Sequence, residues 1–140
     1  MYLKVFFILF LISSLYSIND NYWIHKEKIK LKKDAFYTAW IYKDRGSNKE
    51  YKKILYFRWT LFHNEVLIMH LNLEKFNHQF TLKQEVFLDS FKLDIFDSYL
   101  GSNNPFLFIK FISFDKKTSE VTFMFFIRDE FGSIEVKLLK

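Results

Sequence analysis

The chain has 140 residues, a net charge of +5 and no cysteine, which suits a single domain with its own hydrophobic core. The lack of cysteine excludes disulfides, thiol catalysis and a lipoprotein anchor. The sequence contains 19 Phe, 8 Tyr and 3 Trp. We interpret most of the Phe as core, because Phe buries a large apolar area without needing a hydrogen-bond partner.

Residues 1–17 have the pattern of a secretory signal peptide. Lys4 precedes an apolar run over 5–12, and smaller, more polar residues follow as far as Ser17. The apolar run is shorter than the roughly 20 residues that a helix needs to cross a bilayer. We therefore predict cleavage after Ser17, a mature single domain over 18–140, and a periplasmic or secreted location in a bacterium. The alternative is an uncleaved N-terminal membrane anchor.

Apolar and polar residues alternate with a period of two through most of the remaining chain, as they do in half-buried strands. The segments that we expect to form strands are 28–33, 36–43, 53–62, 66–74, 80–83, 106–114, 121–127 and 134–138. Residues 85–100 fit a helical face as well as a strand, and we prefer a loop through Asp89 and Ser90 followed by a strand. Turn residues separate these segments at 44–48, 77–79, 101–105, 115–120 and 129–132.

The best-defined hairpin joins 53–62 to 66–74 through a three-residue loop at 63–65. In this register one face is wholly apolar and the other is mixed, so the apolar pattern specifies the pairing. The apolar partners are Leu55 with Leu73, Phe57 with Leu71, Trp59 with Met69 and Leu61 with Leu67. The mixed partners are Tyr56 with Asn72, Arg58 with His70, Thr60 with Ile68 and Phe62 with Val66.

These segments predict an all-β domain of about eight short antiparallel strands, arranged as a β-sandwich. A small closed β-barrel is the alternative. Segments 106–114 and 121–127 are apolar at nearly every position. We expect them to be central strands with both faces covered, or else to carry an exposed apolar patch.

The densest charge cluster is a run of lysines that alternate with Ile29 and Leu31. Such lysines are typical of an edge strand that resists sheet-to-sheet aggregation, and this is our preferred interpretation. The alternative is a basic stripe for an anionic partner such as lipid headgroups, a polyanionic glycan or an acidic protein. The candidate contact residues in this stripe are Lys28, Lys30 and Lys32.

The sequence has no pattern that indicates catalysis. It has no Gly-x-Ser-x-Gly elbow and no Gly-rich phosphate loop. The four histidines (His25, His63, His70 and His78) lack the short His-x-His spacings of a metal site, so we predict no metal and no cofactor. An exported chain without a recognition motif also argues against a nucleic-acid partner.

We therefore expect an exported, non-catalytic binding or scaffold protein, an accessory subunit of a bacterial cell-envelope assembly. Its candidate interaction surface is the mixed face of the hairpin, together with the three lysines above. The mixed-face residues are Tyr56, Arg58, Thr60 and His70. One alternative is a carrier with a Phe-rich cavity of several hundred Å³ for a small apolar ligand. The other is an envelope glycan hydrolase with two facing carboxylates.

Overall fold

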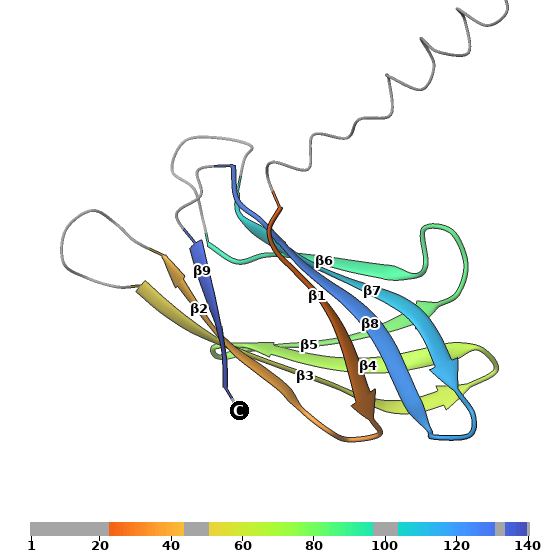
Figure 1. Ribbon diagram of the computed structural model, residues 1–140. Coiled ribbons are helices and arrows are strands. Elements are labelled where there is room, and N and C mark those ends of the chain that lie inside the picture. The colour runs from red at the N-terminus through yellow and green to blue at the C-terminus, as the bar shows by residue number, and fades with distance from the viewer. Residues whose placement is uncertain (1–22, 44–50, 97–103, 131–133, 140) are drawn as a thin grey trace, which may run out of the picture.

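The computed structural model describes residues 23–43, 51–96, 104–130 and 134–139, which form two antiparallel sheets packed face to face (Figure 1). The nine strands in these residues are β1 (Trp23–Lys32), β2 (Tyr37–Lys43), β3 (Tyr51–His63), β4 (Val66–Leu73), β5 (Phe76–Lys83), β6 (Ser90–Asp94), β7 (Phe106–Asp115), β8 (Glu120–Arg128) and β9 (Ile134–Leu138). The predicted all-β sandwich is confirmed. The signal peptide predicted over 1–17 lies outside the described residues.

Among the described strands each sheet has two free edges, so the alternative of a closed barrel is wrong. The four-stranded sheet has the order β1-β8-β7-β6, and the five-stranded sheet has the order β5-β4-β3-β2-β9. The described residues contain no helix long and apolar enough to cross a membrane.

The core lies between the sheets and is rich in Phe, as predicted. Alternate residues of each strand point inward, because successive side chains of a strand lie on opposite faces. Phe57, Phe123 and Phe125 are at most 1 % exposed. The ring of Phe57, from the five-stranded sheet, lies 5.9 Å from Phe123 and 6.0 Å from Phe125 in the other sheet. Ring-on-ring packing therefore joins the two sheets.

The predicted register of the β3–β4 hairpin is confirmed from Leu55 to Trp59 and is wrong beyond that point. The turn has two residues instead of three, because Asn64 and Glu65 both adopt positive φ angles (49° and 64°), as a type I′ turn requires. An irregularity between Trp59 and Leu61 absorbs the one-residue offset.

After this offset, the residues of β3 lie on the opposite face of the sheet from the one predicted. Leu61, predicted on the apolar inner face, is 47 % exposed. Phe62 is instead partly buried against the core, where its ring stacks on Phe114 at 4.2 Å. Its predicted partner, Val66, pairs with His63. Phe62 therefore takes the core position that simple alternation predicts for Leu61.

Residues 77–79, predicted as a break, lie inside β5. The chain turns earlier, at Glu74 and Lys75, where Glu74 has a φ of 58°. Asn72 and Asn77 then pair directly across the two strands. The prediction was wrong because polar residues on the solvent side of an edge strand resemble a loop. β5 is indeed an edge strand.

The segment 85–100 contains strand β6 after a turn, as preferred from its sequence. In this turn the Leu88 amide donates to the Glu85 carbonyl at 3.0 Å. Phe87 has a φ of 72°, which is the third-position geometry of a type II turn and usually requires glycine. Its side chain is 91 % exposed. Phe87 therefore combines a disfavoured backbone angle with almost complete exposure.

The lysine-rich strand β1 is an edge strand, as preferred, because it pairs only with β8. Side chains of the opposite sheet also hold it in place. The Trp59 indole Nε1 donates to the Leu31 carbonyl at 2.8 Å, and the Tyr37 hydroxyl donates to Glu27 Oε2 at 2.9 Å. β1 therefore joins the two sheets at one side of the sandwich.

Candidate functional site

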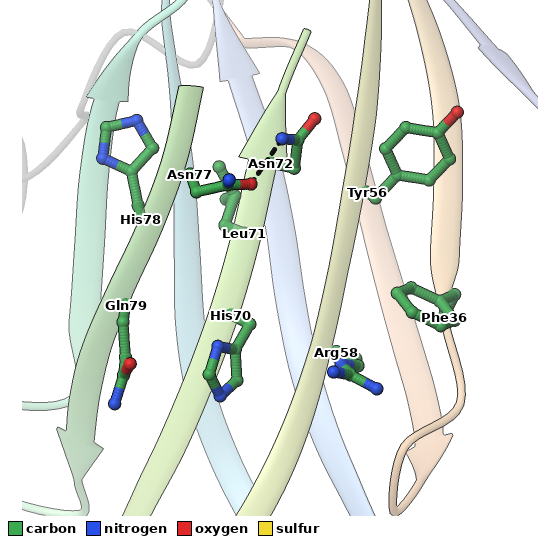
Figure 2. A pocket seen from close by; sticks show the side chains of 9 residues that line it. All are labelled: Phe36, Tyr56, Arg58, His70, Leu71, Asn72, Asn77, His78 and Gln79. Atoms are coloured by element: carbon green, nitrogen blue, oxygen red, sulfur yellow. Dashed lines mark hydrogen bonds between the residues drawn. The ribbon is translucent and has the colours of Figure 1, made fainter. Parts of the chain in front are cut away.

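A shallow pocket of about 420 Å³ lies on the outer face of the five-stranded sheet (Figure 2). It extends across β3, β4 and β5, and Phe36 adds a ring from the turn ahead of β2. Its lining residues are Phe36, Tyr56, Arg58, His70, Leu71, Asn72, Asn77, His78 and Gln79. The lining thus combines aromatic rings with planar hydrogen-bonding groups, and none of these residues is a carboxylate.

The sheet register builds the pocket as two rows that cross three strands. Arg58 pairs with His70, and His70 pairs with Gln79. In the neighbouring row, Tyr56 pairs with Asn72, which pairs with Asn77. Directly opposed residues have Cβ atoms about 4.5–5.5 Å apart, so each row brings its side chains into mutual reach.

Several of these side chains are held by one another. Asn72 Nδ2 donates to Asn77 Oδ1 at 2.6 Å, the contact drawn in Figure 2. The Arg58 guanidinium carbon lies 5.0 Å from the centre of the Phe36 ring, in reach of a cation–π interaction. Arg58 Nη1 also lies 3.7 Å from Asp34 Oδ1, although both side chains are largely solvent-exposed. These contacts arrange the donors and rings before any partner arrives.

The structure divides the predicted interaction surface between the two sides of the sandwich. Tyr56, Arg58 and His70 line the pocket together. Thr60 does not line it, but its Oγ1 lies 3.2 Å from His70 Nε2 and so fixes the imidazole. Lys28, Lys30 and Lys32 are exposed on β1, in the other sheet.

Sequence reasoning missed the half of the pocket that β5 supplies. Asn77, His78 and Gln79 were assigned to a break, so no partner across β4 was expected. A short turn at 74–75 would have paired Asn72 with Asn77, two amides that can form a hydrogen bond across the strands. Phe36 was recognised only as a strand residue, and its 59 % exposure follows from its position just before β2.

The Tyr37–Glu27 contact between the sheets is a structural feature outside the pocket. His25 Nε2 also lies 3.3 Å from Glu27 Oε2. Burial, and secondarily the Glu27 carboxylate, raises the pKa of Tyr37 well above its ordinary value of 10.0. Tyr37 therefore stays a neutral hydroxyl that donates to Glu27 at every physiological pH.

A second hollow, of about 550 Å³, lies where the β3–β4 and β7–β8 hairpins end. Phe62, Phe114, His63 and Glu65 are among its lining residues. Within the described ranges, no three His, Asp or Glu side chains come close enough together to hold a metal ion. The lining of this hollow offers hydrogen-bonding groups and two aromatic rings.

His70 is the pocket residue closest to a catalytic arrangement, because it contacts a hydroxyl. A Ser- or Thr-based mechanism also needs a carboxylate that orients the imidazole. In the described part of the chain, no carboxylate is hydrogen-bonded to His70, whose contact is Thr60. Comparison of the chain with protein-family models, with curated proteins and with solved structures finds no match.

Proposed function

We propose that this chain is an exported, non-catalytic binding protein, an accessory subunit that contacts another protein of the bacterial cell envelope. The observation that carries the proposal is the pocket across β3, β4 and β5, which Tyr56 and Arg58 line from β3. Tyr and Arg are among the residue types that dominate binding energy at protein interfaces.

The exposure of these side chains supports a docking role. Tyr56 is 37 % exposed and Phe36 is 59 % exposed, so both rings have apolar surface left to bury against a partner. Arg58 lies beside Phe36 and is held by Phe36 and Asp34. A side chain ordered in advance loses less conformational entropy on binding, which favours affinity.

The amide side chains on β4 and β5, beside the rings, support a protein as the partner. Asn72, Asn77 and Gln79 offer amide donors and acceptors, which pair well with a peptide backbone or polar side chains. An interface of this kind has apolar and aromatic anchors within a polar rim. The N-terminal segment 1–17 supports export to the envelope, where the partner would be found.

The test is chemical crosslinking of the tagged full chain in envelope extract, followed by identification of the crosslinked proteins. The test variant carries Tyr56→Ala and Arg58→Ala. Its matched control carries Phe76→Ala and Lys137→Ala, which remove another exposed aromatic and another exposed cation from the same sheet.

We expect the wild type and the control to capture the same envelope protein. The test variant should lose that capture and bind the isolated partner at least about tenfold more weakly, because two hot-spot residues are missing. Equal capture by both double variants would remove the pocket from the interface. If the wild type captures no specific protein, the proposed function is wrong.

A further inference from the structure

The outer face of the four-stranded sheet has aromatic rings at its centre and lysines at both edges. One row across the four strands reads Lys26, Phe126, Phe108 and Lys92, so each edge strand contributes a lysine and each central strand a Phe. Lys28 extends the charged edge on β1, two residues beyond Lys26. We call these five residues and Trp23 the lysine–aromatic face.

The rings of this face form a continuous, half-exposed surface. Trp23 lies 5.2 Å from Phe126 and 6.0 Å from Phe106, and Phe108 lies 6.0 Å from Phe126. The face lies outside the core, because the inward residues of the same strands, such as Phe125 and Ile109, are completely buried. The rings therefore present apolar area on the solvent side of a sheet whose core is already filled.

The lysines of this face lie beside its rings and not beside carboxylates: Lys26 Nζ is 5.7 Å from the centre of the Phe126 ring, and Lys92 Nζ is 4.1 Å from that of Phe106. In the described ranges no ion pair includes Lys26, Lys28 or Lys92. Two other cations of the same sheet are paired: Lys110 lies 3.2 Å from Asp89, and Arg128 lies 3.4 Å from Glu130. Asp94, in the next row, accepts a hydrogen bond from Asn104 at 3.5 Å. The face thus carries excess positive charge beside apolar rings.

Two observations identify what would cover this face. Aromatic rings with lysines around them suit a membrane surface, where the rings enter the interface and the lysines meet anionic headgroups. The chain also enters the domain here, because Trp23 is the first residue of β1 and residues 1–22 precede it. That preceding segment contains the apolar run 5–12, which directs the chain to a membrane during export, before the predicted cleavage after Ser17.

We propose that the lysine–aromatic face docks on a membrane surface rich in anionic lipid. The pocket on the opposite sheet then points away from the bilayer and stays open to its protein partner. The proposal depends on different residues from the pocket and can be tested separately from it. Each lysine close to an anionic surface should raise the partition coefficient about fivefold.

The test measures how the full chain partitions onto two kinds of vesicle, pure phosphatidylcholine and an equal mixture of phosphatidylcholine and phosphatidylglycerol. Any contribution of the N-terminal apolar segment, which the predicted cleavage after Ser17 would remove, is the same on both vesicles. The ratio of the two partition coefficients therefore isolates the effect of lipid charge. The test variant carries Lys26→Gln, Lys28→Gln and Lys92→Gln. The control carries Lys52→Gln, Lys75→Gln and Lys137→Gln, an equal change of charge at exposed or half-exposed positions of the other sheet and its β4–β5 turn.

We expect the wild type to prefer the anionic vesicles by about 100-fold or more, and the test variant to lose most of that preference. The control should keep it, and roughly 0.5 M NaCl should abolish it because exposed charges are then screened. If the wild type shows no preference, the proposal is wrong. If both triple variants lose the preference equally, net charge alone drives binding and the face has no special role.

Trp23 supplies a second readout that does not depend on the lysine variants. Its fluorescence should shift to shorter wavelength on anionic vesicles, and the shift should disappear in Trp23→Phe. Trp59 is only 3 % exposed and Trp40 belongs to the other sheet, so neither reports on this face. Tighter binding to poly-glutamate than to anionic vesicles, at equal charge, would assign the face to an acidic protein and overturn the proposal.

Discussion

The two outer faces of this sandwich use their polar residues in opposite ways. On the pocket face, the side chains hold one another: Asn72 bonds to Asn77, and His70 contacts Thr60. On the lysine–aromatic face, Lys28 has no ion-pair partner among the described residues. Substitutions in the pocket should therefore change both stability and binding, whereas substitution of Lys28 should change binding alone.

The largest effect should come from the core that both faces share. Phe123→Ala removes a fully buried ring that packs against Phe57 of the opposite sheet. The free energy of unfolding should fall by about 3–5 kcal/mol, because the residual cavity is only partly filled by relaxation. Chemical denaturation measures this loss, and partner capture and vesicle binding should decline together. A loss below about 1 kcal/mol would mean that the sheets do not depend on this contact.

The next effect should come from the hydrogen bond that joins the sheets. Tyr37→Phe leaves Glu27 without its phenolic donor and should lower the free energy of unfolding by about 1–3 kcal/mol at pH 7. The folded state raises the pKa of Tyr37, so this stabilisation is complete below pH 10.0 and is lost as pH rises above that value.

Denaturation between neutral and alkaline pH tests the sign of this effect. The wild type should lose stability above about pH 10, and Tyr37→Phe should lose less, so the difference between the two chains narrows. If the stabilities of the wild type and Tyr37→Phe fall in parallel as pH rises, Tyr37 does not control the loss of stability at alkaline pH.

Phe87, which belongs to neither face, should give an effect of the opposite sign. Phe87→Asn replaces a bulky residue at a φ of 72° with one that tolerates the left-handed conformation. The free energy of unfolding should rise by up to about 1 kcal/mol, since the exposed ring contributes little packing. Ile112→Asn, a nearby exposed position in a strand, is the control and should give no such gain.

The smallest changes in the free energy of unfolding should distinguish the pocket face from the lysine–aromatic face. Asn72→Ala should lower the free energy of unfolding by roughly 0.5–1.5 kcal/mol, because Asn77 loses its donor. Lys28→Gln should change it by less than about 0.5 kcal/mol. Thermal melts of the two variants measure this difference directly. Equal losses of stability would contradict the contrast between the hydrogen-bonded Asn72 and Lys28, which has no ion-pair partner among the described residues.

Alternation along the strands made most of the fold predictable. The inward side of β3 and β4 was correctly predicted from Leu55 to Trp59, and the lysines of β1 indicated its place at an edge. The local backbone geometry of the β3–β4 hairpin was not predicted correctly. Asn64 and Glu65 form a two-residue turn, and the irregularity that compensates for it depends on backbone angles that periodicity does not encode.

The site was less predictable than the fold, because it depends on which strands become neighbours. Tyr56, Arg58 and His70 could be grouped from one hairpin, since the register of that hairpin follows from its apolar pattern. The second half of the pocket needed β5 beside β4, and Asn77 looked like a turn residue. Trp23 and Lys92 are distant in sequence and share a face only because β8 and β7 lie between their strands.

The position of β1 also determines how the domain bears mechanical force. A pull on the chain ahead of Trp23 enters through this strand. If directed along the strand, it acts in shear on the long antiparallel ladder with β8, so that many hydrogen bonds resist it at once. The Trp59–Leu31 and Tyr37–Glu27 bonds pass part of the load to the other sheet. A domain tethered at its N-terminus would thus be strained as one body instead of being unzipped strand by strand.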